Sequence, residues 1–291
     1  MDLIKLRTPH EKRRTGRVPL TSEQSLRELL SKYWPWHYDD TLEEVARLLF
    51  SNDLGWEPVR LLTPPAGEVI SPLGRAFEYP DDAIQEAALR VLDSMAVIPA
   101  GEVYIGEDLM QLHVNQFQLG RYPVTNAQYH RFVRQTGHRA PPNWDNARYP
   151  ESKGDHPVTH VSCADAEAYA AWAGARLPTF EEWERAVRGD DGRLFPWGDE
   201  IDRPRCNTAE LGAGGTTPVG AFPEGVSPFG CYDMLGNVWE WTSTWYDEAE
   251  QYFRVVRGGA WYYNHDQSTC VSYEFFSKDY ADFVIGFRIA R

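Results

Sequence analysis

The sequence is poor in features that mark several classes of protein. Its apolar runs are short and interrupted, so none approaches the ~20 residues of a membrane-spanning helix. The first residues, MDLIKLRTPHEKRRTGR, lack the apolar stretch of a secretory signal. Only 29 Lys and Arg residues stand against 43 Asp and Glu, and the net charge of −14 disfavours nucleic acid and anionic membranes as partners. We therefore expect a cytoplasmic protein with no nucleic-acid or membrane partner.

Cysteine is also scarce. The four residues Cys163, Cys206, Cys231 and Cys270 show neither CxxC nor zinc-like spacing. Isolated thiols in a reducing compartment usually serve as small buried hydrophobes, so we assign them no chemistry. Aromatic residues are abundant instead, at 13% with eleven tryptophans, and packing, binding or both must explain them.

Local patterns divide the chain into two parts. Residues 1–96 predict a small helical segment, with amphipathic helices at 21–34, 41–50 and 81–95. Residues 97–291 predict short strands joined by glycine turns and two capped helices, at 162–174 and 178–189. Long connections rich in glycine, proline and aromatics follow Asp190, and such loops are usually functional or pinned by ions or packed tryptophans. The expected fold class is α+β and loop-rich.

Seven motifs in the second part carry a resemblance to a known family. They are IPAGEVYIG, RYPVTNAQYHRFV, HPVTHVSCADAEAYAAWAGARLPTFEEWERAVRG, FPWGDE, SPFGCYDMLGNVWEWTSTWY, VVRGGAW and GFRIAR. Their order from about Val97 to Arg291 resembles the formylglycine-generating-enzyme-like (sulfatase-modifying factor) family. The resemblance implies a C-type-lectin-like fold and a family of copper-dependent oxidases, iron-dependent sulfoxide synthases and proteins that only bind. The site must decide between these activities.

The resemblance implies catalytic metal sites that this chain does not match. The oxidases hold copper with two cysteines after the RGGAW motif, and the matching positions here are Tyr263 and Ser268, which leaves Cys270 alone. The sulfoxide synthases hold iron with three histidines, two of them in a helical HxxxH. The HxxxH here, His156 to His160, encloses PVT, which favours extended backbone. We therefore expect no redox cofactor and no enzyme, that is, a non-catalytic branch. A metal-dependent oxidoreductase with a rearranged site is the alternative.

The resemblance also implies a calcium loop at YDMLGNVWEW. Its ligands would be the side chains of Asp233 and Glu240 and the carbonyls of Gly236 and Val238, a set of hard oxygens that suits Ca²⁺. The other interpretation is a surface turn over buried Trp239 and Trp241, and both stay open.

The C-terminal segment 257–291 obeys no helix or strand period. Seven of the residues from Tyr262 to Val284 are aromatic, more than twice the chain average of 13%, and Ser, Asp and Asn lie between them. This mixture is typical of a paratope, where Tyr supplies contact area with few rotamers and small polar residues supply adaptable hydrogen bonds.

The resemblance further extends to the variable proteins of diversity-generating retroelements. Their C-terminal segment, bounded by motifs like RGGAW and GFR, is rewritten at adenines of a template. An AAC codon changed at its adenines becomes NNC, which encodes Phe, Ser, Tyr, Asp, His and Asn among others, but never Gln, Glu or Lys. Most residues of the segment fit this set, and Gln267, Glu274 and Lys278 would be framework.

We therefore predict a ligand-binding protein that displays a diversified C-terminal surface on a C-type-lectin scaffold. Its partner would be a protein or other macromolecule, and the N-terminal helices could instead contact a neighbouring regulatory system. The predicted contact residues are Tyr262, Tyr263, Asn264, His265, Asp266, Ser268, Ser272, Tyr273, Phe275, Phe276, Ser277, Asp279, Tyr280, Asp282 and Phe283.

Overall fold

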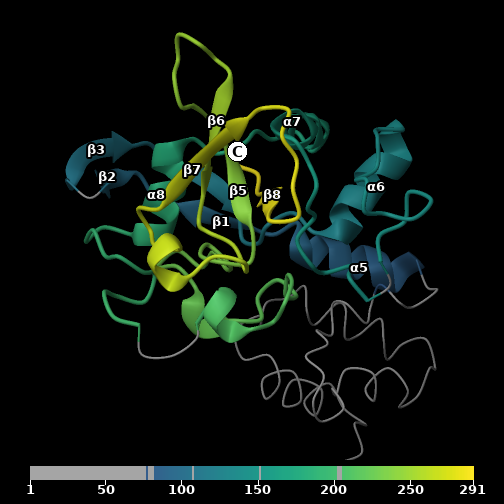
Figure 1. The fold of residues 1–291 in the computed structure, drawn as a ribbon, viewed down its shortest axis with the longest axis horizontal. Helices are drawn as coiled ribbons and strands as arrows, with labels where there is room; N and C mark the ends of the chain where they lie inside the picture. Colours follow the sequence, from purple (N-terminus) through teal and green to yellow (C-terminus); the bar gives the residue numbers. More distant parts are fainter. Residues whose placement is uncertain (1–76, 78–81, 107, 151, 202–204) are drawn as a thin grey trace, which may run out of the picture. The chain divides into compact units, whose positions relative to one another are not determined.

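The computed structural model describes residues 77, 82–106, 108–150, 152–201 and 205–291 (Figure 1). The chain divides into two compact units, Met1–Gly55 and Trp56–Arg291, and every described residue belongs to the second. The predicted helices at 21–34 and 41–50 lie outside the described residues, and the domain boundary at 96 stays a prediction. No helix of the described residues is long and apolar enough to cross a membrane.

The described part begins with a helix and two small sheets. Helix α5 (Asp82–Leu92) confirms the helix expected at 81–95. Strand β1 (Met95–Ile98) pairs antiparallel with β4 (Phe117–Gly120), and β2 (Gly101–Ile105) pairs antiparallel with β3 (Met110–Val114). The strands and glycine turns expected after position 97 are therefore present.

Three further helices begin at capping boxes. Helices α7 (Cys163–Trp172) and α8 (Phe180–Arg188) were predicted, and Ser162 and Thr179 cap them as expected. Helix α6 (Asn126–Thr136) was not predicted; Thr125 caps it by accepting from Gln128 N. Each cap satisfies a backbone N–H that the first helical turn leaves unpaired.

A four-stranded sheet forms the C-terminal part of the fold. Its order is β7-β6-β5-β8, with β5 (Trp239–Trp245), β6 (Phe253–Arg257), β7 (Tyr273–Ser277) and β8 (Ile285–Phe287). Strand β5 pairs antiparallel with β6 and parallel with β8, and β6 pairs antiparallel with β7. Strand β7 is therefore an edge strand, and it lies in front of the sheet's other strands in Figure 1.

Two apolar clusters form the core and explain much of the tryptophan content. One packs α6 and α7 against β5 and β8, and the other packs α8 against the two small sheets. Trp183, Trp239 and Trp241 are fully buried, and Trp241 Nε1 donates to the carbonyl of Val161 at 3.0 Å.

The four cysteines are free and buried, as predicted. Burial raises the pKa of Cys163 and of Cys206 to about 12, and it also raises the pKa values of Cys231 and Cys270. Their thiols stay protonated at neutral pH and are poor nucleophiles.

Candidate ligand-binding surface

Buried ion pairs anchor both ends of the C-terminal segment. Arg257, at the end of β6, donates through Nη2 to Glu184 Oε2 of α8 at 2.9 Å. Arg288, just after β8, donates through Nε and Nη2 to the two oxygens of Glu240 on β5, both at 2.7 Å. All four side chains are at most 1% exposed. These ion pairs therefore fix the segment to the core at both ends, in addition to the pairing of β7 with β6.

Further hydrogen bonds complete the anchor at Glu240. Trp183 Nε1 donates to Glu240 Oε2 at 2.7 Å. The remaining Arg288 donors reach the carbonyls of Gly120 and Tyr232, both at 2.9 Å. Because the partners of a buried charge are hard to replace, removing one partner of such a pair costs about 3–5 kcal/mol. The frame below the segment is consequently stiff.

The glycine pair after Arg257 makes a tight turn in which a side chain at either position would clash with neighbouring atoms. Gly258 has φ 96° and Gly259 has φ 74°, both in the left-handed region. A Cβ on Gly258 would lie 2.7 Å from the carbonyl oxygen of Met234, and one on Gly259 would lie 2.0 Å from Ser268 Oγ. The RGG motif thus brings the chain tightly over the core before the segment turns outward.

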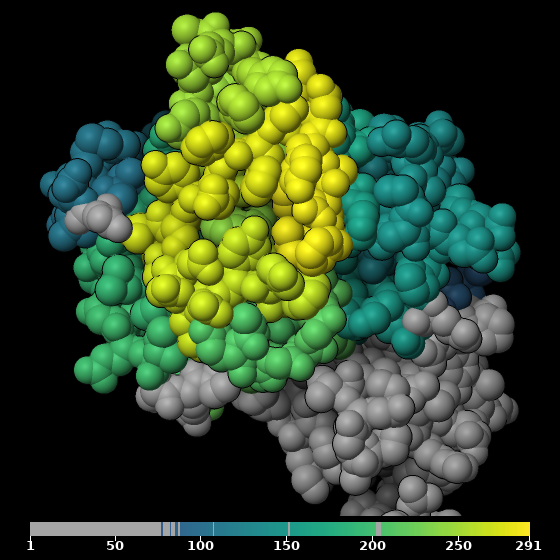
Figure 2. Space-filling view, in the orientation of Figure 1, coloured from purple at the N-terminus to yellow at the C-terminus, as the bar shows by residue number. Residues whose placement is uncertain are grey.

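Exposed aromatic rings gather on this segment and the neighbouring hairpin. Seven aromatic side chains of the described residues are exposed, by 36% to 64% of their surface, and all lie between positions 246 and 283. In Figure 2 the C-terminal segment, in yellow, and the β5–β6 hairpin, in lime, share the face turned to the viewer. We call this set the aromatic surface: Tyr246, Tyr252, Tyr262, Tyr273, Phe275, Tyr280 and Phe283.

Most of the predicted contact residues reach solvent. Those exposed are Tyr262, Asn264, Asp266, Tyr273, Phe275, Asp279, Tyr280 and Phe283, and those half-buried are Tyr263, His265, Ser272, Phe276, Ser277 and Asp282. Ser268 is the correction: it is 1% exposed because it packs beneath the turn at Gly259, so it belongs to the frame. The predicted framework residues Gln267, Glu274 and Lys278 are exposed as well.

The hairpin between β5 and β6 was missed by the sequence reasoning. Tyr246 stacks on Phe275 with ring centroids 3.9 Å apart, and Lys278 N donates to the carbonyl of Tyr252 at 3.2 Å. The signal was present as two tyrosines around an acidic turn, YDEAEQY, but these residues precede the RGGAW boundary. The aromatic surface therefore joins the C-terminal segment to a second element.

Contacts between neighbouring rings hold the surface in place. Phe276 and Tyr280 stack with centroids 5.0 Å apart, and Tyr262 meets Phe283 edge-on at 5.9 Å. Tyr280 Oη donates to Asp282 Oδ2 at 2.6 Å. Side chains fixed in this way lose less conformational entropy when a ligand binds.

An open depression of about 570 Å³ lies at one end of β7. Apolar side chains of Leu109, Leu194 and Val271 line it, together with Asp266 and Tyr273. Arg188 also reaches it, but its guanidinium is already bound by Glu184 and backbone carbonyls. The hydroxyl side chains of Thr269 and Ser272 also line it, so the depression has mixed apolar and polar walls with one carboxylate, that of Asp266, that is unpaired among the described residues.

The two histidines of the HxxxH pattern lie outside any helix and have different hydrogen-bond partners. His156 Nδ1 lies 3.0 Å from Thr216 Oγ1, and burial lowers the pKa of His156 to about 3. His160 has φ 60° and its Nδ1 lies 3.1 Å from Thr159 Oγ1. Within the described ranges no three His, Cys, Asp or Glu residues are grouped to hold a metal ion.

The predicted calcium set is only partly available. Arg288 and Trp183 already occupy three of the roughly four acceptor positions of Glu240, so Glu240 does not fit the role of a calcium ligand. Asp233 accepts a hydrogen bond from Gly220 N at 2.6 Å, and burial raises its pKa to about 6. Trp239 and Trp241 are buried, as the alternative interpretation expected, but residues 231–242 are buried throughout, so the loop is not a surface turn.

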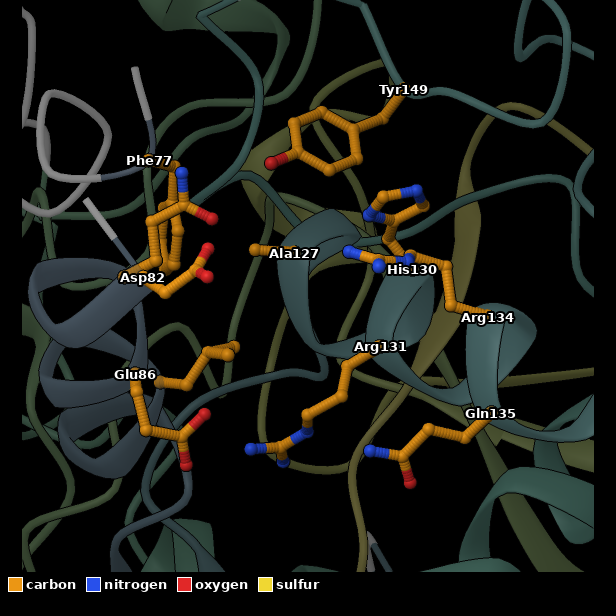
Figure 3. Close-up of a pocket in the computed structure, with 11 residues that line it drawn as sticks. Phe77, Asp82, Glu86, Ala127, His130, Arg131, Arg134, Gln135 and Tyr149 are labelled. Atoms are coloured by element: carbon orange, nitrogen blue, oxygen red, sulfur yellow. The ribbon is translucent and has the colours of Figure 1, made fainter. Parts of the chain in front are cut away.

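A separate cavity of about 350 Å³ lies between α5 and α6 (Figure 3). Asp82 and Glu86 project from α5, and His130, Arg131 and Arg134 project from α6. Arg131 is held by the carboxylate of Asp93, at 2.7 Å. Because the two walls carry opposite charges, they compensate one another and leave little preference for a ligand of either sign. None of the predicted site residues lies here.

Most of the chain matches the model of one protein family. The model of the sulfatase-modifying factor enzyme 1-like domain matches residues 81–291. The chain belongs to this family. The predicted resemblance is therefore confirmed, and with it the C-type-lectin-like α+β fold.

Curated relatives correct one expectation. The chain is 33% identical to inactive C-alpha-formylglycine-generating enzyme 2 of Bos taurus, over 58% of this chain and 76% of that protein. It is 34% identical to hercynine oxygenase of Mycolicibacterium smegmatis, over 59% of this chain and 55% of the oxygenase. It is 33% identical to formylglycine-generating enzyme of Mus musculus, over 62% of this chain and 69% of that enzyme. The expectation of a non-enzyme is wrong, because relatives named as enzymes show that the family is enzymatic.

Solved structures share the fold. PvdO from Pseudomonas aeruginosa superposes with a TM-score of 0.59 at 25% identity, over 68% of this chain and 93% of PvdO. Treponema denticola variable protein 1 superposes with a TM-score of 0.54 at 18% identity, over 67% of this chain and 94% of the variable protein. At this identity the second likeness establishes the fold alone.

Proposed function

We propose that this protein binds a macromolecular ligand, most simply another protein, through the aromatic surface. The observation that carries the proposal is the placement of the exposed aromatic side chains. All seven within the described residues fall in one stretch of the chain: five lie on the segment between the buried ion pairs of Arg257 and Arg288, and Tyr246 and Tyr252 lie on the neighbouring β5–β6 hairpin. Exposed aromatic residues on a rigid support are the typical anchors of protein interfaces.

We also propose that residues 257–291 are diversified, as in a retroelement variable protein. The support is the separation of roles within the segment: Arg257 and Arg288 hold the frame, while most residues between them reach solvent. A near-copy of the DNA that encodes 257–291, differing at adenines and lying beside a reverse transcriptase gene, would establish the mechanism. Its absence from the neighbouring DNA would reduce the segment to an ordinary binding loop.

Site-specific photo-crosslinking in the native host tests ligand binding directly. The photoreactive residue p-benzoylphenylalanine replaces Tyr262, Tyr273 or Tyr280 in the full chain. Val97 and Met110 serve as control positions, because they are 54% and 56% exposed on other strands. The proposal expects one common adduct from the three tyrosine positions and none from the controls. Equal adducts from all five positions, or none from the tyrosines, would refute it.

Catalysis by a rearranged metal-dependent oxidoreductase site is the second candidate, and the names of the curated relatives favour it. The residues at the two thiol positions, Tyr263 and Ser268, do not fit a copper ion, since neither offers a soft ligand. Cys270 is fully buried with a raised pKa. Stoichiometric copper or iron in the purified full chain, with oxygen consumption, would support this candidate; calcium alone would not.

Calcium is proposed as a structural ion at Asp233, with the carbonyls of Gly236 and Val238. The support is a buried carboxylate whose pKa lies above its ordinary value, a group that a cation would favour in its ionised form. The melting temperature of the wild type should then rise in calcium chloride, and that of Asp233→Asn should not. We further propose a reducing, cytoplasmic location, which the four free cysteines support.

A further inference from the structure

Carboxylates accompany the exposed rings of the aromatic surface. Between positions 246 and 283 the chain carries seven Asp and Glu residues. Six are exposed, namely Asp247, Glu248, Glu250, Asp266, Glu274 and Asp279, and the seventh, Asp282, is half-buried. Over the whole chain the ratio of acidic to basic residues is only 43 to 29. Acidic groups are therefore concentrated here beyond the chain's general acidity.

Cations are correspondingly few on this stretch. Arg257 is fully buried against Glu184, and Arg254 is bound by Glu167 at 2.8 Å. Lys278 is thus the one exposed cation between 246 and 283. The local field attracts positive groups, because single-signed charge raises the local concentration of oppositely charged partners and their association rate.

The rings themselves suit positive groups. Arg254 already lies over the Trp245 ring, with its guanidinium carbon 3.5 Å from the ring centroid. Exposed Tyr246 and Tyr252 flank the same hairpin next to Asp247, Glu248 and Glu250. A guanidinium or ammonium from a partner can stack on such a face while a neighbouring carboxylate pairs with its charge.

The depression beside β7 has the same character. Leu109, Leu194 and Val271 can cover the methylene stem of a long side chain, and Asp266 can pair with its charged end. Lys and Arg bury their stems and keep their charged ends near water in this way. Tyr273, which belongs to the aromatic surface, is one of the residues that line the depression.

We infer that the partner of this surface is a protein segment rich in lysine and arginine. It would lie across the hairpin and the C-terminal segment, with one cationic side chain in the depression beside Tyr273. This inference rests on the proposed binding function and adds the chemical class of the ligand. It also assigns the β5–β6 hairpin, which lies outside the segment proposed to vary, as a fixed part of the interface.

Peptide binding to the full chain tests the charge of the partner. The probe is a fluorescein-labelled peptide of Arg-Gly repeats, and matched Gln-Gly and Glu-Gly repeats are the controls. Fluorescence anisotropy should show Arg-Gly binding about tenfold tighter than Gln-Gly, weakening as salt is raised, with no binding of Glu-Gly. Equal affinity for Arg-Gly and Gln-Gly repeats would overturn the inference.

Two triple variants separate the local surface from the overall charge. Asp247→Asn/Glu248→Gln/Glu250→Gln removes three carboxylates of the hairpin, and Glu86→Gln/Asp145→Asn/Glu200→Gln removes three exposed ones elsewhere. The hairpin variant should bind Arg-Gly about tenfold more weakly, and the control within about twofold of wild type. Asp266→Asn and Tyr273→Ala should each weaken binding about fivefold.

Equal losses in the two triple variants would show that general acidity alone attracts the peptide, and the inference would fail. Melting temperatures of all variants establish that they are folded. If the basic peptide fails while Tyr262, Tyr273 and Tyr280 still form a common photo-adduct in the host, the surface binds a partner of different chemistry. If both fail, the proposed binding function fails as well.

Discussion

Replacing Glu240 with glutamine should destabilise the protein strongly although the change removes no volume. Glu240 accepts two hydrogen bonds from Arg288 and one from Trp183, and neither Glu240 nor Arg288 is more than 1% exposed. An amide keeps one acceptor oxygen but presents its NH₂ group to a guanidinium donor. The variant therefore removes the hydrogen-bonded counterion of the buried Arg288 charge, at a cost of about 3–5 kcal/mol.

Chemical denaturation measures this loss, and a double-mutant cycle identifies its cause. For a domain of this size each kcal/mol lowers the melting temperature by about 2–4 °C, so Glu240→Gln should melt roughly 6–20 °C below wild type. Arg288→Met should lose a similar amount. The double variant Glu240→Gln/Arg288→Met buries no charge at this point and should lose clearly less than the sum of the two single losses.

Two results would refute this account of the frame. A loss below about 1 kcal/mol in Glu240→Gln would place the pair in the range of solvent-screened surface ion pairs. Strict additivity in the cycle would mean that the two side chains do not depend on one another.

Four further predictions concern the frame and the surface. Above pH 6 in EGTA, Asp233→Asn should be more stable than wild type. The pKa of Asp233 in the folded protein, about 6, exceeds its ordinary 3.8, so the free energy of unfolding of wild type should fall by about 3 kcal/mol as the pH rises from about 4 through 6. Urea titrations measure this fall, and a difference in stability between variant and wild type that does not change with pH would contradict the prediction. Gly259→Ala should lower the free energy of unfolding by about 3 kcal/mol, because the new methyl group would clash with Ser268. Gly137→Ala, at φ 72° with no atom near the new methyl group, should lower it by about 1 kcal/mol, and equal losses would contradict the tight turn at Gly259. Hydroxyl-radical footprinting should label Tyr262 and Tyr273 quickly and Trp239 and Trp241 slowly; the reverse order would invert the assignment of surface and core. The four buried thiols should resist alkylation in native protein and react only on unfolding, and rapid native modification of Cys270 would show that it is accessible.

Local sequence signals were sufficient where the structure is set by short-range chemistry. The capping boxes at Ser162 and Thr179 predicted α7 and α8, since a cap and its partner lie three residues apart. The capping box of Thr125 and Gln128 is an equally local signal, although α6 was not predicted from it. The exposed aromatic run after Tyr262 was predicted from its lack of any period, which a buried strand or helix would have imposed.

Contacts between residues distant in sequence could not be predicted. Burial of Ser268 depends on the turn at Gly259 folding over it, and the pairing of Glu240 with Arg288 joins positions 48 residues apart. No local pattern reports such a pairing, so Glu240 was assigned to calcium by resemblance. The hairpin tyrosines were missed for the same reason, because only the stacking of Tyr246 on Phe275 connects them to the segment.

The two missing thiols do not decide whether a member of this family is an enzyme. Absence of the two thiols at Tyr263 and Ser268 suggested a non-enzyme, yet relatives across the family carry the names of enzymes. Missing ligands for one metal exclude that site and no other chemistry.

The fourfold variant Tyr262→Ala/Tyr273→Ala/Tyr280→Ala/Phe283→Ala tests the central claim most directly. If these rings stand in solvent on a stiff frame, its melting temperature should stay within about 4 °C of wild type. A crosslinker at Phe275 should form the ligand adduct in the otherwise wild-type chain and not in the fourfold variant. A melting temperature more than about 10 °C lower would mean that the rings stabilise the protein's own interior, and the surface would lose its proposed role.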